Sequence, residues 1–268
     1  MQLKVEPTRQ SDCSDAEWQA RVDLAAAHRL AYMHGFSEGI FNHLTLVVPG
    51  RSDRYYQIPF GTHWCEVQAS TFMEVGFDGE VKRGSGDVER SAYAIHMPMH
   101  RSNLSHCAAV FHTHMPFTSA LTRLEDPRIK EIGQTEVILM NKIAYDEHYD
   151  GPAWDPSEGD RLAKVLGNKT ILFMANHGVT TVGASVAEAY DRLYYIERVA
   201  QVQIYAMWTG QRLKQMSPDI VNRTMNNNGQ DTRTATAPQM PKYDPPPAVR
   251  HFEALKRILD RKEPDYKD

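Results

Sequence analysis

The clearest pattern along the chain is helical, with apolar residues recurring every three or four positions. It first follows the sequence S-D-A-E at 14–17, a capping-box pattern, and predicts a helix that ends near Gly35. It recurs behind Ser185 and Glu188, which form a second capping-box pattern, and there predicts the longest helix of the chain. Shorter helices are predicted over 88–101, 116–124 and 157–166. Pro98 lies inside the first of these and is expected to kink or shorten it.

Runs of β-branched and apolar residues predict strands between these helices. The sequence FNHLTLVVPG at 41–50 is a β-type run that ends in a Pro–Gly turn, and the pair Asp78–Gly79 predicts a β-hairpin. Further strands are predicted at 55–59, 107–111, 170–175 and 180–182. The pattern at 136–142 is compatible with either a strand or a helix.

The character of the sequence changes after Gln215. Residues 222–247 are rich in Asn, Thr, Gln and Pro, which predicts an extended or partly disordered connection. A short amphipathic helix is expected after it, and its apolar face consists of Val249, Phe252, Leu255 and Ile258. That face needs a surface to cover, on its own subunit or on a neighbouring one. We therefore expect a main domain over 1–215 and a C-terminal extension over 216–268.

Charge and cysteine content narrow the class of protein. The 268 residues carry a formal net charge of −4 without blocks of like charge, so we expect no nucleic-acid or membrane partner and instead a small molecule or another protein. The three cysteines are widely spaced and form no CxxC pair, which indicates a reducing compartment. The first 18 residues lack an apolar signal-peptide core, so a soluble, cytoplasmic protein is expected.

Three histidines follow predicted buried strands. The sequence AVFHTHMP places His112 and His114 two residues apart, on the same face of a strand at its end. Another strand ends with His177, and Gly178 there permits a tight turn and close backbone approach. Three imidazoles that converge suit an ion such as Zn²⁺ and leave a fourth position open for catalysis. The alternative is a set of partly buried, hydrogen-bonded histidines without a metal.

Weaker candidates lie on the helix predicted over 88–101 and behind it. His96 and His100 are four residues apart, but no HExxH motif supports a metal role, and His96 is instead a candidate acid/base group or substrate contact. Arg90 and Ser91 either face a pocket or are solvated residues at the start of a helix. Glu136 is either a functional carboxylate or an ordinary surface group.

These motifs resemble those of the class II aldolase/adducin family, and the similarity extends over nearly the whole chain. The matching segments are FNHLTLVVPG, IPFGTHWCEVQAS, IHMPMHRSN, AVFHTHMPFTSALT, YDEHYDG, FMANHGVTTVG and VAEAYDRLYYIERVAQVQ. The C-terminal sequence HFEALKRILDRKEPDY is similar to the endings of adducin-like bacterial members. The resemblance implies that 1–215 form a class II aldolase/adducin-like α/β/α three-layer domain with a central, mainly antiparallel sheet, assembled as a homotetramer.

The resemblance also implies one divalent metal ion per chain, held by His112, His114 and His177. Zinc is the first expectation, with manganese or cobalt as alternatives. In the aldolases the ion polarises the carbonyl and hydroxyl of the substrate and stabilises the enediolate left when a carbon–carbon bond breaks, which is electrostatic catalysis by a Lewis acid.

The chain departs from the sugar-phosphate aldolases at the phosphate pocket and at the acid/base group. Their S-S-E motif corresponds here to Arg90, Ser91 and Ala92, so the glutamate is missing. Phe41 replaces the family's glycine before Asn42. The catalytic tyrosine that a neighbouring subunit donates has no clear match, and 134–136 fall in that region.

The expected function is therefore a divalent-metal-dependent carbon–carbon lyase, either a decarboxylase or a retro-aldolase, that acts on a small hydroxy- or keto-carboxylate through a metal-stabilised enolate. His96 and Glu136 are the expected acid/base groups. Asn42, Arg90 and Ser91 are the expected substrate contacts, because arginine can pair with a carboxylate through two hydrogen bonds. The alternatives are a non-catalytic adducin-like scaffold, which has no need of three metal ligands, and a sugar-phosphate aldolase or epimerase.

Overall fold

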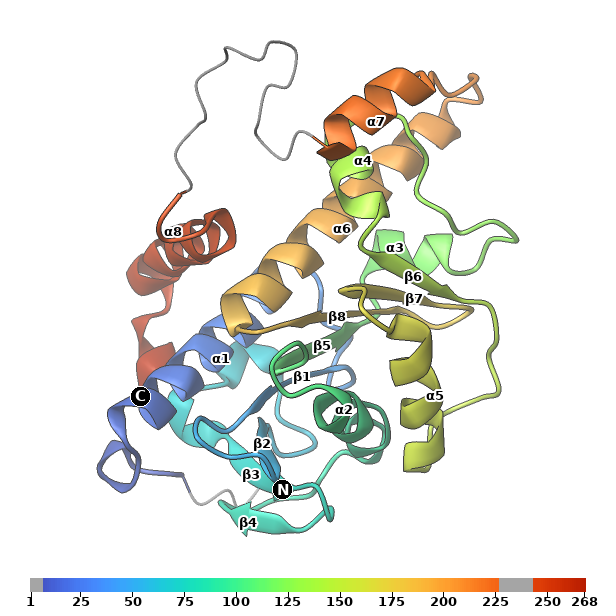
Figure 1. Cartoon of the computed structure of the whole chain (residues 1–268). Coiled ribbons are helices and arrows are strands. Elements are labelled where there is room, and N and C mark those ends of the chain that lie inside the picture. The colour runs from blue at the N-terminus through green and yellow to red at the C-terminus, as the bar shows by residue number, and fades with distance from the viewer. Residues whose placement is uncertain (1–6, 227–242) are drawn as a thin grey trace.

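The computed structural model describes residues 7–226 and 243–268 and arranges them around one mixed sheet (Figure 1). Within these residues the sheet has eight strands in the order β4-β3-β2-β1-β5-β8-β7-β6. The strands are β1 (His43–Val47), β2 (Arg54–Gln57), β3 (Met73–Gly76), β4 (Val81–Arg83), β5 (Ala109–Thr113), β6 (Ile143–Asp146), β7 (Ile171–Met174) and β8 (Val179–Gly183). Neighbouring strands are antiparallel except for β6 and β7, which are parallel.

Helices cover both faces of this sheet. They are α1 (Asp15–Met33), α2 (Arg90–Ser102), α3 (Pro116–Leu121), α4 (Gln134–Met140), α5 (Pro156–Leu166), α6 (Val186–Trp208), α7 (Pro218–Asn226) and α8 (Pro247–Lys262). α1 and α6 pack against Leu44 and Phe111 on one face, whereas α2 and α5 pack against Val110 and Leu172 on the other. The expected α/β/α fold with a mainly antiparallel sheet is confirmed. No helix in the described ranges is long and apolar enough to cross a membrane.

The two long helices begin at the predicted caps. Both halves of the capping box at Ser14 are present, and Gly35 adopts a φ of +75° just beyond the end of α1. At α6 only half of the predicted box forms. The hydroxyl of Ser185 accepts the backbone N–H of Glu188 at 3.3 Å, but the Glu188 carboxylate accepts the N–H of Ala184, also at 3.3 Å. The Glu188 carboxylate thus binds the residue before the N-cap, whereas a complete capping box would have it bind the N–H of Ser185 itself.

Pro98 does not shorten α2, since the helix continues to Ser102. Proline cannot donate a hydrogen bond to the carbonyl of Ala94 four residues earlier. That carbonyl faces Gly159 of α5, where an added Cβ would clash with the Ala94 oxygen and lie 2.8 Å from Pro98 Cγ. The close packing of α5, made possible by Gly159, therefore holds α2 together across the proline.

Two segments differ from the pattern or go beyond it. The stretch at 136–142 resolves into α4 and a turn, and β6 follows, a four-residue strand that the pattern does not predict. Residues 218–226 form α7, so the start of the segment expected to be extended (222–247) is helical. α7 packs on α4, and such packing outweighs local composition in a short helix. Residues 227–242 of that segment lie outside the described residues.

The apolar face of α8 covers its own chain, because α8 packs on α1 and α6. Phe252 is 2% exposed and Leu259 is fully buried, whereas Ile258, which was expected on this face, is 36% exposed. The helical repeat is 3.6 residues, so residues spaced every three positions drift around the helix. By position 258 the drift turns Ile258 toward solvent, and Leu259 lies on the buried face instead. An ion pair of 2.7 Å between Lys256 and Asp23 of α1 flanks the contact.

Removal of the Phe252 ring is expected to destabilise the fold. Phe252→Ala should lower the free energy of unfolding by about 3 kcal/mol or more, because it leaves a cavity between α8 and α6. Ile258→Ala, on the same helix, should change it by less than about 1 kcal/mol. Urea unfolding followed by circular dichroism measures both, and equal effects would contradict the docking of α8 through Phe252.

Candidate metal centre

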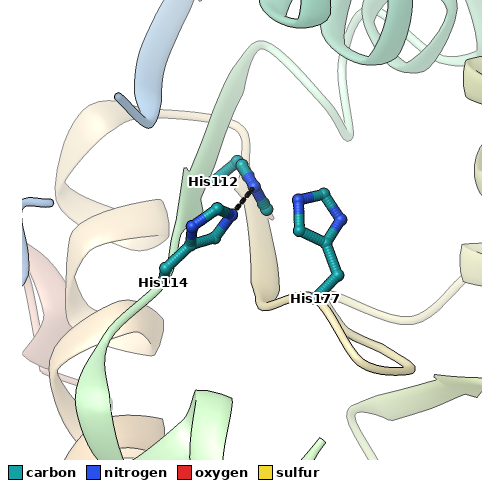
Figure 2. Close-up of side chains that lie close together, drawn as sticks. All are labelled: His112, His114 and His177. Carbon is teal, nitrogen blue, oxygen red and sulfur yellow. Dashed lines mark hydrogen bonds between the residues drawn. The ribbon is translucent and has the colours of Figure 1, made fainter. Parts of the chain in front are cut away.

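The three candidate ligands meet at the ends of neighbouring strands (Figure 2). His112 lies near the end of β5 and His114 just beyond it, while His177 lies in the turn from β7 to β8. Thr113 of β5 pairs with Val179 of β8, so this turn is held beside the end of β5. One nitrogen from each imidazole lies within 4.8 Å of the other two. The structure thus brings together the three residues that the sequence suggests as metal ligands.

Hydrogen bonds fix which nitrogen of two of these rings is free. Nδ1–H of His112 donates to the carbonyl of Val179 at 3.1 Å, and Nδ1–H of His114 donates to the carboxylate of Glu38 at 2.5 Å. Each ring therefore keeps a lone pair on Nε2, and these two Nε2 atoms are 3.1 Å apart. Two facing lone pairs repel each other unless a cation binds both. The donor set therefore fits a divalent ion.

The protonation of the rings agrees with metal binding at neutral pH. Burial holds the pKa of His112 well below its usual value, and the neighbouring His177 and His114 lower it further. Burial, followed by His114, lowers the pKa of His177 to about 4. Both rings are thus neutral at pH 7, which is the form that coordinates a metal.

The backbone around the ligands is held by close packing and by polar side chains. A Cβ on Gly178 would lie 2.5 Å from the carbonyl oxygen of Thr113 and 2.7 Å from Cδ2 of His114, so only glycine fits. Asn42, in a left-handed conformation with φ +73°, accepts the backbone N–H of His114 at 3.1 Å. The guanidinium of Arg123 donates to the carbonyl of His177 at 3.1 Å. Both sides of the site are therefore fixed before any ligand binds.

The three expected substrate contacts have different surroundings in the structure. Asn42 is 6% exposed, and its amide nitrogen has no hydrogen-bond partner among the described residues. Arg90 begins α2, and its guanidinium carbon lies 6.0 Å from the ring centre of Trp154. The hydroxyl of Ser91 donates to the carboxylate of Glu89 at 2.8 Å and lies 3.2 Å from Nε2 of His43.

Within the described residues, neither of the two expected acid/base groups forms a hydrogen bond with the triad. His96 is completely buried, and among the described residues His43 is its hydrogen-bond link to the site. Glu136 is 5% exposed on α4, which packs against α6 and α7. No hydrogen bond or ion pair connects Glu136 with the triad within the described chain.

The residues predicted from the sequence do not include His43, which lies next to the triad. It pairs with His112 across β1 and β5, and the two ring centres are 5.1 Å apart. Nδ1 of His43 lies 2.8 Å from Nε2 of His96, and the Thr45 hydroxyl lies 2.7 Å from Nδ1 of His96 and 2.8 Å from Nε2 of His100. The signal was present in the sequence, because His43 and Thr45 alternate on one face of an otherwise apolar strand.

A backbone carbonyl sets the direction of this chain of hydrogen bonds. The carbonyl of Cys107 can only accept, so Nδ1–H of His100 donates to it at 2.5 Å. Burial lowers the pKa of His43 and of His100 to about 4 and holds that of His96 well below its usual value, so the three rings are neutral. Each ring then accepts at one nitrogen and donates at the other. The chain ends with a lone pair on Nε2 of His43, beside Ser91.

Comparison with known proteins places the chain in a family. A sequence profile described as the class II aldolase and adducin N-terminal domain matches residues 22–204, which include all three ligands. The chain belongs to the class II aldolase and adducin family. Glu38, Asn42 and His43 also fall within the matched range, so the surroundings of the triad lie in the family domain as well.

Solved members of the class II aldolase and adducin family share this architecture. An aldolase II superfamily protein from Pseudomonas syringae superposes with a TM-score of 0.85 at 30% identity, covering 97% of this chain and 99% of that one. An L-fuculose 1-phosphate aldolase from Glaciozyma antarctica has a TM-score of 0.77 at 19% identity, covering 98% and 97%, which shows likeness of fold. Alpha-adducin of Rattus norvegicus is 28% identical over 90% of this chain and 33% of its own length.

Loss of the Glu38 carboxylate, which accepts the hydrogen bond from His114, is expected to weaken metal binding. In Glu38→Gln the neutral amide makes the imidazole a poorer donor to the metal, and affinity should fall roughly 10- to 100-fold. Competition with a chromophoric zinc chelator measures the change. Glu80→Gln, on the exposed β3–β4 hairpin, is the control and should bind as the wild type does. Equal affinity in the two variants would show that Glu38 does not support His114.

A methyl group at position 178 is expected to weaken zinc binding more than the loss of the Glu38 carboxylate does. Gly178→Ala forces the turn away from Thr113 and His114, so the ligands should no longer converge and zinc binding should fall more than in Glu38→Gln. Gly167→Ala is the control, because its nearest neighbouring atom would be 3.8 Å away. It should lose some stability, since φ is +55° there, but keep its zinc affinity. Wild-type affinity in Gly178→Ala would contradict the packing described here.

Proposed function

We propose that this protein is a metal-dependent carbon–carbon lyase, a decarboxylase or a retro-aldolase, that acts on a small hydroxy- or keto-carboxylate. The observation that carries the proposal is the pair of Nε2 lone pairs on His112 and His114, which face each other with His177 beside them. Three imidazole ligands leave a coordination position for substrate, as catalytic rather than structural sites do. Zinc is our first choice of metal, and manganese or cobalt would suit the same nitrogen ligands.

The reaction class follows from the chemistry of the donor set. When bound, a divalent ion supplies Lewis-acid stabilisation to the negative charge that develops as the carbon–carbon bond breaks. The chain's own residues then have to bind the substrate carboxylate and return a proton to the carbon that keeps the electron pair. We assign the first task to Arg90, which has no ion-pair partner within the described residues, with Asn42 beside the metal.

For proton transfer we propose the group formed by His43, Ser91 and Glu89. The Ser91 hydroxyl has one proton for two acceptors, the Glu89 carboxylate at 2.8 Å and the His43 lone pair at 3.2 Å. His96 then acts as a positioning residue, because it accepts from Nδ1–H of His43 and leaves the other nitrogen to face the site. Glu136 can share the acid/base role only if a neighbouring subunit brings its α4 to the site, as the homotetramer that we propose would allow.

The adducin relationship supports a second candidate, a scaffold without catalytic activity. Alpha-adducin matches over most of this chain, although the match covers a third of the adducin. Against the scaffold stand the three converging imidazoles, which an interaction domain does not need. A sugar-phosphate substrate is less well supported, because Phe41 replaces the family's glycine before Asn42 and its ring lies 6.5 Å from that of Phe60. We propose a cytoplasmic enzyme on the basis of the cysteine content.

Elemental analysis combined with turnover tests the proposed function. The wild-type protein should contain about one zinc, manganese or similar ion per chain, and His112→Ala should contain none. Release of carbon dioxide or aldehyde from hydroxy-carboxylates should fall roughly 100-fold or more in that variant. His106→Ala is the matched control, since this ring binds the carbonyl of Lys169 away from the site. Normal turnover in His112→Ala would refute the lyase, and a protein that takes up no metal would favour the scaffold.

A further inference from the structure

We propose that Glu197 of α6 is a positioning residue of the metal centre, which holds His114 in place through the backbone that follows this ligand. The inference rests on the proposed function, because it concerns the same three-histidine site. Glu197 is 4% exposed, and its two carboxylate oxygens accept the backbone N–H groups of Phe117 and Thr118, both at 2.8 Å. The chain is therefore tied to α6 from the third residue after a metal ligand.

His114 needs support that His112 does not. His112 lies within β5, where the hydrogen bonds of the sheet hold its backbone on both sides. The pairing of β5 with β8 ends at Thr113, so His114 lies just beyond the last pair. Its backbone N–H donates to Asn42, and after Met115 the chain enters α3 at once. The place of His114 therefore depends on what holds the start of α3.

α3 cannot hold its own start. It has six residues, a length at which a helix depends on tertiary contacts. Its N-cap residue is Met115, whose side chain forms no capping hydrogen bond, and Pro116 has no N–H to donate. The N–H groups of Phe117 and Thr118 are thus the first donors of the helix that need a partner. A nearby Ser, Thr, Asp or Asn usually supplies it, but here it comes from Glu197, 80 positions after Phe117.

The carboxylate fixes the start of α3 more closely than apolar packing does. α3 packs on α6, and the ring of Phe117 lies 5.3 Å from that of Tyr205 in an edge-to-face contact (Figure 1). An apolar contact tolerates small shifts, whereas hydrogen bonds weaken steeply when their angle changes. Burial raises the pKa of Glu197, so keeping the charged form here costs free energy. We infer that the two hydrogen bonds set the position of α3, and with it that of His114.

Gln203 of α6 provides a matched control for Glu197. It is 1% exposed, its side-chain oxygen accepts the N–H of Lys130 at 2.8 Å, and its amide donates to the carbonyl of Arg128 at 3.1 Å. Like Glu197, it therefore ties a loop to α6 through two hydrogen bonds. That loop lies beyond the end of α3 and carries no metal ligand.

Zinc affinity of the full chain tests the inference. Glu197→Met and Gln203→Met each remove two buried hydrogen bonds and keep an unbranched side chain, so both should unfold at lower urea concentration than the wild type. In competition with a chromophoric chelator, zinc affinity should fall roughly tenfold or more in Glu197→Met and change less than about twofold in Gln203→Met.

Two further measurements separate positioning from a general loss of stability. The visible absorption bands of bound Co²⁺ depend on the arrangement of its ligands, so they should change in Glu197→Met and stay as in the wild type in Gln203→Met. Glu197→Gln keeps one acceptor oxygen at nearly the same volume, so its zinc affinity should lie between those of the wild type and Glu197→Met. If Glu197→Met does not fold, Glu197→Gln takes its place in the comparison and should still bind zinc several-fold more weakly than Gln203→Met.

The outcomes distinguish this inference from the proposed function. Equal zinc affinity in the Glu197 and Gln203 variants, or an unchanged cobalt spectrum in Glu197→Met, would overturn the positioning role and leave the lyase standing. A wild type that binds zinc but releases no product from hydroxy-carboxylates would remove the lyase, while loss of affinity in the Glu197 variants alone would still support the positioning role. A wild type that binds no zinc would overturn both.

Discussion

The site depends on one electrostatic constraint, which is that the lone pairs of His112 and His114 face each other across 3.1 Å. In each ring the other nitrogen has an acceptor-only oxygen to which it can donate, which favours the tautomer with its lone pair on Nε2. These oxygens are the carbonyl of Val179 and the carboxylate of Glu38. A divalent cation turns the repulsion into two bonds, so the geometry of the rings favours a metal. The rest of the fold holds the rings of His112 and His114 close together.

Several parts of the fold keep the three histidines in place. The antiparallel pairing of β5 with β8 brings the turn with His177 beside the strand end, and Gly178 lets the two backbones approach closely. On the same face of the sheet, a row of buried polar side chains lies under α2. Buried imidazoles cost stability unless their nitrogens are paired, and the chain from His43 to His100 pairs them in one fixed direction. This polar layer orients His43 and gives the site a rigid base.

Much of the fold could be predicted from the sequence, and the errors have physical causes. Amphipathic periodicity and the caps located α1 and α6, because each helix buries one face and ends in open loops. The shortening that was one of the two outcomes expected at Pro98 does not occur, and a residue distant in sequence, Gly159, packs over the freed carbonyl. β6 is too short to show a period, and it pairs in parallel with β7, which local sequence does not reveal.

The convergence of the three candidate ligands was predictable because histidines at the ends of buried strands form a local pattern. Their partners were harder to find, since Glu38 and His43 approach the triad only through tertiary contacts. The most direct test is X-ray absorption spectroscopy of the zinc-loaded protein. We expect three nitrogen ligands at about 2.0–2.1 Å with one further oxygen ligand. Sulfur in the first coordination shell, or fewer than three imidazole nitrogens, would contradict the three-histidine centre.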